Sequence, residues 1–196
     1  MKKLTIWTVL PVLSLCAAVV MYYLWFQGWL QFYLRDVMQT VDHMGYITVG
    51  VTALMLYFSA VQLVNWRINK TLLVLTYMIY FAIMMGLLFG KASGAQGFSM
   101  DTFGFVDTFL AGNLRVITIG NVLAFVPIGF LMKKLSPLMA LFSAGILIFI
   151  VEGLQYALHV GYFDTGDLFL NVSGIMFGYV IIRIFASSHK QMIEQE

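Results

Sequence analysis

Six long apolar runs dominate the sequence and constrain its fold more than any other feature. They lie near residues 5–26, 46–64, 71–90, 116–132, 137–159 and 168–186. Each is long enough, or nearly so, for the roughly 20 residues that a membrane-spanning helix needs. Because lipid offers no hydrogen-bond partner to a bare backbone N–H or C=O, a segment that crosses it must be helical. The sequence therefore predicts an all-α polytopic membrane protein, a bundle of six transmembrane helices.

The composition excludes an ordinary soluble domain. Hydrophobic residues make up 61% of the 196 residues and charged residues only 10%, whereas soluble domains are about half apolar and a quarter charged. A single cysteine excludes an intrachain disulfide. The fold is therefore expected not to depend on the redox state of its compartment.

The distribution of Lys and Arg predicts the orientation of the chain. With six spans both termini lie on one side, which would hold eight basic residues: Lys2, Lys3, Arg67, Lys70, Lys133, Lys134, Arg183 and Lys190. The other side would hold three, Arg35, Lys91 and Arg115. We therefore expect a multi-pass protein of the cell membrane with both termini in the cytoplasm. The net charge of +2 then reflects cations facing the anionic inner leaflet, and it indicates no nucleic-acid partner.

The connecting segments divide the chain into two halves and a tail. Residues 1–90 are predicted to form a three-helix segment, 91–186 a second three-helix module, and 187–196 a cytoplasmic tail. Apolar side chains of 29–44 recur on one stripe, which fits a helix in the outer interface or an amphipathic extension of the first span. Residues 91–115 are too polar to span and too aromatic for a free linker. We expect them at the outer membrane surface or dipping into it.

Polar side chains of the last three runs converge at one depth. At a rise of about 1.5 Å per residue, Asn121 lies about 9 Å below Arg115 on the fourth run. Glu152 lies about 10 Å below His159 on the fifth run, again by its separation in sequence. The sixth run starts from the outer side with Asp167 at its mouth. Three helices therefore bring polar groups to the same outer third of the bilayer.

These residues also share helix faces. Glu152, Gln155 and His159 are spaced i, i+3, i+7 and form a single stripe. Asp167 and Asn171 begin a second stripe, which continues as a Gly-x-x-x-Gly face that lets helix backbones approach closely. We therefore predict a polar pocket that is open to the outer side. Its predicted ligand-binding residues are Arg115, Asn121, Glu152, Gln155, His159, Asp164, Asp167 and Asn171.

Several of these residues also have a purely structural interpretation. A charged side chain such as Glu152 costs roughly 2.5–3.5 kcal/mol within a span, which favours a functional role, but a protonated or Arg115-paired carboxyl would lock helix packing. Asp164 and Asp167 fit a turn and an N-cap of the sixth helix, and His159 suits the membrane interface. No cofactor or metal is expected, because DTGD lacks the ligands of a calcium loop and no His or Cys pair offers a zinc site.

Three ordered motifs carry a family resemblance. NVLAFVPIGF at residues 121–130 is followed about twenty residues on by E-x-x-Q, which begins at Glu152, and then by GYFDTGDLFLNVSGIMFGY at 161–179. This set covers roughly residues 91–186 and resembles the VanZ-like family of small bacterial membrane proteins. The fold expected from the apolar runs, a polytopic helical protein, agrees with that resemblance.

The resemblance implies an association with low-level resistance to teicoplanin and related glycopeptides, which bind cell-wall precursors and carry lipid tails. It implies no particular reaction. One departure concerns Tyr162, because the family commonly has Arg at this place in the third motif. Either another residue, for example Arg115, supplies the positive charge of that Arg, or the ligand differs from that of the family.

These observations leave several functions open. In the first, the pocket binds a membrane lipid, a lipid-linked precursor or another cell-wall ligand, and so changes what a glycopeptide meets at the membrane surface. In the second, an intramembrane enzyme acts on such a ligand, with Glu152 as general acid or base and with Asp164 and Asp167 as a second acid or a divalent-ion site. A transporter is disfavoured because no inverted repeat is evident. A scaffold for partner proteins would need no pocket.

Overall fold

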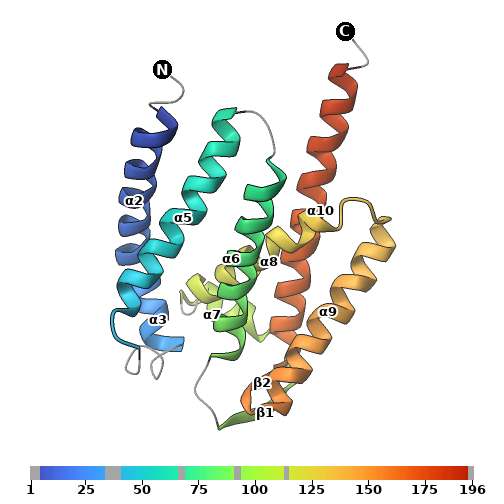
Figure 1. Ribbon diagram of the computed structural model, residues 1–196. Coiled ribbons are helices and arrows are strands. Elements are labelled where there is room, and N and C mark those ends of the chain that lie inside the picture. Colours follow the sequence, from blue (N-terminus) through green and yellow to red (C-terminus); the bar gives the residue numbers. More distant parts are fainter. Residues whose placement is uncertain (1–4, 34–40, 66–68, 91–93, 113–114, 194–196) are drawn as a thin grey trace. The chain divides into compact units, whose positions relative to one another are not determined.

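The structure is a computed structural model (Figure 1). It describes residues 5–33, 41–65, 69–90, 94–112 and 115–193. Contacts divide the chain into two compact units, Met1–Ala92 and Ser93–Glu196. Both units are built mainly from helices, and each of the six predicted apolar runs is occupied by helix. This confirms the helical membrane character of the chain.

In the first unit, successive helical elements cover the first apolar run. They are η1 (Thr5–Val9), α2 (Leu10–Met21), η2 (Tyr22–Phe26) and α3 (Gln27–Tyr33). α5 (Met44–Asn65) packs against α2, and α6 (Lys70–Phe89) packs against α5. The predicted interfacial helix over 29–44 is helical as far as Tyr33, and residues 34–40 lie outside the described residues.

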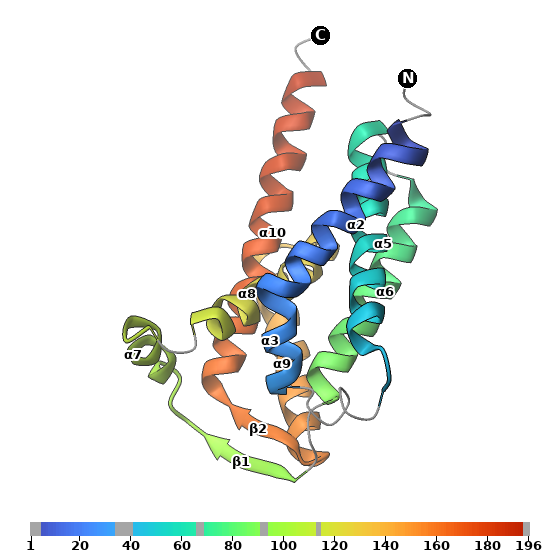
Figure 2. The ribbon, with the colours of Figure 1, turned by 90° about the vertical axis from the view of Figure 1, so that its left-hand side faces the viewer.

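The second unit is centred on its long C-terminal helix. Its elements are β1 (Ala95–Ser99), α7 (Gly104–Leu110), α8 (Arg115–Leu131), α9 (Pro137–Ala157), β2 (Val160–Asp164) and α10 (Thr165–Ile193). α10 packs against both α8 and α9, and α8 crosses it obliquely (Figures 1 and 2). α9 begins where the Ser136 hydroxyl accepts a hydrogen bond from the backbone N–H of Met139, with Pro137 in the first turn. Both features are typical of helix N-termini.

The helices of the six apolar runs differ in whether they are long enough to cross a membrane. Within the described residues, five helices are long and apolar enough to cross a membrane: Ile6–Leu24, Met44–Asn65, Lys70–Phe89, Pro137–Ala157 and Thr165–Ala186. α8 is apolar, but its 17 residues rise only about 25 Å, which is less than the hydrocarbon core of about 30 Å. The chain is thus a multi-pass membrane protein, and α8 is the short helix that occupies the fourth predicted run.

A two-stranded parallel sheet is the feature that the all-α prediction missed. β1 pairs with β2 in a register that places Phe98 opposite Phe163, and these two rings stack with centroids 4.8 Å apart. A Cβ on Gly97 would collide with the ring of Tyr162, so Tyr162 lies over the β1 backbone. The two strands are more than sixty residues apart in the chain, and neither five-residue segment reveals its partner by its own pattern.

Glycines make the crossing of α8 and α10 close. A Cβ on Gly174 would collide with the carbonyl oxygen of Val122, and a Cβ on Gly178 with that of Val126. On the other helix, a Cβ on Gly129 would collide with the α10 backbone. The two backbones are therefore in direct contact, as the Gly-x-x-x-Gly face predicted.

This contact predicts a stability loss that depends on position. Gly178→Ala should lower the free energy of unfolding by about 1–3 kcal/mol, because the new methyl group has to push two backbones apart. Thermal unfolding of the purified protein in detergent measures the change. The matched control is Gly153→Ala on α9, where an added Cβ meets nothing within 4 Å and no loss is expected. Equal effects of the two substitutions would contradict the close crossing.

Candidate functional site

The buried face of α9 ends in polar side chains. Ala140, Ala144, Ile148, Glu152 and Gln155 are the buried residues of this helix, and they follow one another at intervals of one turn. Glu152 is only 2% exposed and Gln155 only 3%. The stripe that packs within the unit is therefore apolar at its first half and carries a carboxyl and an amide toward its C-terminal end.

The junction between β2 and α10 lies next to this end of α9. The backbone N–H of Asp164 points to Oε2 of Glu152 at 3.5 Å, which is a long contact. The Asp164 carboxylate accepts a hydrogen bond from the backbone N–H of Gly166 at 2.7 Å, and it thereby caps the start of α10. The hydroxyl of Thr102 donates to that of Thr165 at 2.9 Å. The Asp164 side chain thus has the capping role that the sequence offered as its structural interpretation.

Asp167 and Asn121 connect the two helices that cross. The side-chain amide of Asn121 on α8 donates a hydrogen bond to Oδ1 of Asp167 at 2.8 Å. Asp167 lies in the first turn of α10, where the helix dipole stabilises a negative charge. The equal depth expected for these two residues is therefore matched by a direct contact between their side chains.

Asn171 lies one turn below Asp167 and is 3% exposed. Among the described residues, no hydrogen-bond partner reaches its Oδ1 atom. An unpaired buried acceptor costs about 1–3 kcal/mol, and native proteins seldom keep one without a water, an ion or a functional reason. Asn171 Oδ1 is therefore a buried acceptor that lacks a partner among the described protein groups.

We define the polar cluster as Asn121, Glu152, Gln155, Asp167 and Asn171. They come from α8, α9 and α10, and each makes a contact or is buried within the second unit. Thr118 is also buried on α8, three residues before Asn121 and thus on the same side of the helix. Sequence reasoning missed Thr118, although the i, i+3 spacing to Asn121 could have identified it.

The partners that the structure gives Arg115 lie on α7. Its Nε donates to the carbonyl of Phe109 at 2.7 Å, and a terminal nitrogen donates to the carbonyl of Leu110 at 3.2 Å. The guanidinium also lies over the ring of Phe109, 5.6 Å from its centroid. Arg115 thus binds the last carbonyls of α7, where a cation complements the helix dipole.

His159 departs from the predicted stripe. α9 ends at Ala157, two residues earlier than the predicted run, and His159 is exposed with a φ of 58°. This left-handed conformation turns the chain from α9 toward β2, so the helical spacing that links Glu152 to Gln155 does not extend to His159. Its backbone carbonyl accepts a hydrogen bond from Gly94 at 2.8 Å, which places His159 at the start of the strand pair.

The cluster differs from the predicted open pocket in its enclosure. Glu152, Gln155 and Asn171 are almost fully buried, and two grooves of this unit are lined by other residues. Within the described residues, no three His, Cys, Asp or Glu side chains form a group that could hold a metal ion. The carboxylate and amide oxygens of the cluster are thus enclosed by the packing of the second unit.

The comparison with known proteins gives one match. A family model described as VanZ/LLP1 matches residues 12–186. That range extends well beyond the three motifs and covers most of both units of the chain. No curated protein and no solved structure matches the chain.

The effect of replacing Asn171 on the free energy of unfolding tests whether its Oδ1 has a structural role. Asn171→Leu should leave the free energy of unfolding unchanged or raise it, by up to about 1–3 kcal/mol, because it removes an unpaired buried acceptor. Asn121→Leu is the control and should lower it by about 1 kcal/mol, because it removes a bonded amide. Chemical denaturation in detergent micelles measures both. A loss at Asn171 as large as that at Asn121 would show that its Oδ1 has a structural partner.

Proposed function

The chain belongs to the VanZ/LLP1 family, and we propose that it acts in VanZ-type resistance as a multi-pass protein of the bacterial cell membrane. In this proposal the polar cluster binds a lipid-linked or cell-wall ligand. The bound ligand changes what teicoplanin or a related lipoglycopeptide meets at the membrane surface.

The Oδ1 of buried Asn171, which has no hydrogen-bond partner among the described residues, is the observation that carries the proposal. It lies one turn from Asp167 on α10, a helix that packs against α9, and Glu152 is one of the buried residues of α9. A carboxyl group in a spanning helix costs roughly 2.5–3.5 kcal/mol, and such residues usually face the interior with a role. Since the oxygens of Asn171, Asp167 and Glu152 are acceptors, the ligand group is a hydroxyl, an amide N–H or an amine. The amide of Asn121 holds Asp167 in place for it.

The proposal includes six spans with both termini in the cytoplasm. The five long helices together with the short α8 give an even number of crossings, and Lys and Arg are then eight on the cytoplasmic side against three outside, as the positive-inside rule requires. α8 tolerates its short length because it packs against α10 along its glycine contacts. In this orientation the start of α10, and with it the cluster, lies toward the extracytoplasmic surface.

We favour binding over the enzyme alternative. In the enzyme alternative, Asp164 or Asp167 would act as a second acid beside Glu152. The Asp164 carboxylate caps α10, and the Asp167 carboxylate holds Asn121. These hydrogen bonds position the acids for recognition.

Replacing the Glu152 carboxyl by an amide tests the proposal. Glu152→Gln should lower the teicoplanin concentration that cells tolerate several-fold, because the amide weakens a hydrogen bond to the ligand that is worth about 0.5–1.5 kcal/mol. Asn171→Leu should lower it as well without loss of protein stability. Growth at graded teicoplanin concentrations measures the effect in cells that depend on this protein for tolerance.

The matched control is Asp107→Asn, which removes a charge from an exposed position of α7 and should leave tolerance unchanged. Insertion is checked in a Cys16→Ser background with a membrane-impermeant maleimide: His159→Cys should react in intact cells and Lys134→Cys only after permeabilisation. Both positions are exposed. Unchanged tolerance in a correctly inserted Glu152→Gln protein would contradict the proposed function, and the opposite labelling pattern would contradict the orientation.

A further inference from the structure

The turn between α8 and α9 presents two adjacent cations. The backbone N–H of Leu135 donates a hydrogen bond to the carbonyl of Met132 at 2.9 Å, which closes a turn with Lys133 and Lys134 at its two central positions. Both lysines are exposed. The side chain of Ser136 then caps α9 directly after the turn. The two charges are therefore carried by a hydrogen-bonded turn between two helices.

A buried tyrosine of α10 holds this turn. The hydroxyl of Tyr179 donates a hydrogen bond to the carbonyl of Leu135 at 2.9 Å, and Tyr179 is only 3% exposed. Arg183 follows one turn later on the same face of α10. It is exposed, and its guanidinium lies over the Tyr179 ring, 5.8 Å from the centroid. One side chain thus contacts both the lysine turn and the arginine, and it gathers the three cations at one end of the second unit.

The helices that carry these cations bring no acid near them. Residues 122–151 and 168–193 contain no Asp or Glu. The first acid along α9 is Glu152, about 22 Å of helix rise from the start of that helix. α10 continues to Ile193, about 15 Å beyond Arg183, before the acids of the tail follow in the sequence. Three neighbouring cations repel one another, so their charge favours an anion from outside these helices.

The first unit supplies no such anion in the proposed topology, in which the turn faces the cytoplasm. Residues 1–92 contain two acids, Asp36 and Asp42. Both lie between the first two spans, which is the extracytoplasmic side. The cytoplasmic segments of this unit contain only cations: Lys2, Lys3, Arg67 and Lys70. Wherever the first unit lies, it therefore adds positive charge at this level of the membrane.

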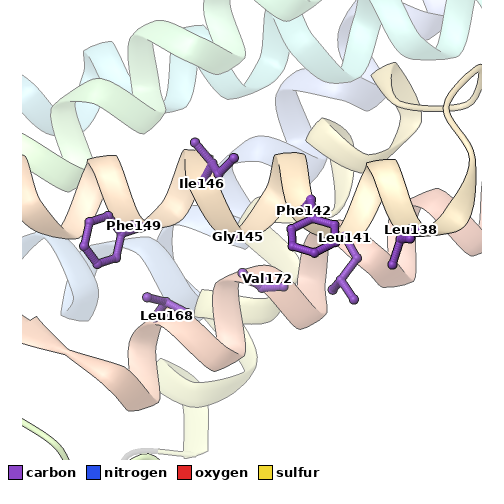
Figure 3. A pocket seen from close by; sticks show the side chains of 8 residues that line it. All are labelled: Leu138, Leu141, Phe142, Gly145, Ile146, Phe149, Leu168 and Val172. Atoms are coloured by element: carbon purple, nitrogen blue, oxygen red, sulfur yellow. The ribbon is translucent and has the colours of Figure 1, made fainter.

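Exposed hydrocarbon flanks the three cations and indicates their depth. Ile184 and Phe185 directly follow Arg183, and Leu131 and Leu138 stand on either side of the turn. These four apolar side chains are all more than half exposed, and Figure 3 shows Leu138 near the N-terminal end of α9. The candidate span Thr165–Ala186 includes Arg183. The cations thus lie at the edge of the hydrocarbon, where the phosphates of lipid head groups lie.

We propose that Lys133, Lys134 and Arg183 form a binding site for the phosphate of one anionic phospholipid of the cytoplasmic leaflet, with Tyr179 as the positioning residue. A guanidinium binds a phosphate through two parallel hydrogen bonds, and a lysine adds a point charge. Basic pockets between helices on the cytoplasmic side are suited to such head groups. The exposed hydrocarbon beside the cations favours a lipid over a free phosphate ion. The site shares no residue with the polar cluster and goes beyond the proposed function, of which it uses only the orientation.

A lipid titration of the full chain tests the site. The protein is held in micelles of a neutral detergent, phosphatidylglycerol is added in steps, and thermal unfolding is recorded at each step. A ligand that binds the folded state raises the unfolding midpoint in a concentration-dependent way. We expect phosphatidylglycerol to raise it with saturation. Phosphatidylcholine, which has no net charge, and inorganic phosphate, which has no acyl chain, should leave it unchanged at the same concentrations.

Substitutions distinguish a built site from general surface charge. Arg183→Gln and Lys133→Gln should each weaken the apparent affinity about five-fold, the contribution of one cation near an anionic lipid. The matched control is Lys70→Gln, which removes the same charge from the exposed first residue of α6 and should leave the affinity unchanged. Tyr179→Phe keeps every charge but releases the turn, and it should weaken the affinity several-fold. A cooperative transition without added lipid checks that each variant folds.

Three results would overturn the proposal. Equal effects of Arg183→Gln and Lys70→Gln would show a general attraction between basic residues and anionic micelles. An unchanged affinity in folded Tyr179→Phe would show that the geometry of the turn does not matter. A midpoint raised as much by phosphatidylcholine or by inorganic phosphate would show that the ligand is not an anionic lipid.

The titration is separable from the test of the proposed function. It contains no teicoplanin, and Glu152→Gln should leave the affinity for phosphatidylglycerol unchanged. Micelles also have no inner and outer side, so the titration tests the site and the maleimide labelling tests the leaflet. Failure of either proposal therefore leaves the other standing.

Discussion

Polar side chains within helices that cross lipid need partners inside the protein, and the close contact of α8 with α10 provides one for Asn121 and for Asp167. The backbones meet because Gly129, Gly174 and Gly178 leave no side chain between them. That approach brings Asn121 within hydrogen-bond distance of Asp167. Buried Asn171 lies one turn further along α10. Without the crossing, Asn121 and Asp167 would not reach each other.

The two sides of α9 serve different purposes. Its buried stripe packs within the unit and ends in Glu152 and Gln155. Its flank carries large exposed apolar side chains such as Phe142 and Phe149, interrupted by Gly145. The first side holds the helix within the unit and carries its buried carboxyl and amide groups, and the second leaves apolar side chains exposed.

Most of the helices could be predicted from the sequence because a lipid environment limits which backbone structures can form. Apolar length sets the span, and lipid forbids an unpaired backbone, so all six runs are helical without any appeal to propensity. The convergence of Asn121 with Asp167 followed from the helix rise, and the burial of Glu152 with Gln155 from the helix period. Both quantities are fixed by local geometry, which is why sequence spacing was sufficient.

Other parts of the site depend on contacts that sequence spacing does not contain. The pairing of β1 with β2 joins segments more than sixty residues apart. The left-handed conformation of His159 breaks the α9 stripe because it ends the helix, and nothing in the spacing of Glu152, Gln155 and His159 signals it. Arg115 was predicted to line the pocket or to pair with Glu152. In the structure its guanidinium donates hydrogen bonds to carbonyls of α7. A groove lined by α9 and α10 depends on how these two helices pack together. The position of Gly145 in the sequence does not predict it.

The central claim is that polar side chains of neighbouring helices face one another inside the second unit, and a double-mutant cycle on Asn121 and Asp167 tests it most directly. Asn121→Ala, Asp167→Ala and the double variant are unfolded in detergent micelles under the same conditions. The account predicts a coupling free energy of about 0.6–1.7 kcal/mol, the range found for interhelical hydrogen bonds in membrane proteins. Single effects that add to within about 0.3 kcal/mol would mean that the two side chains do not interact. That result would contradict the proposed arrangement of α8 and α10.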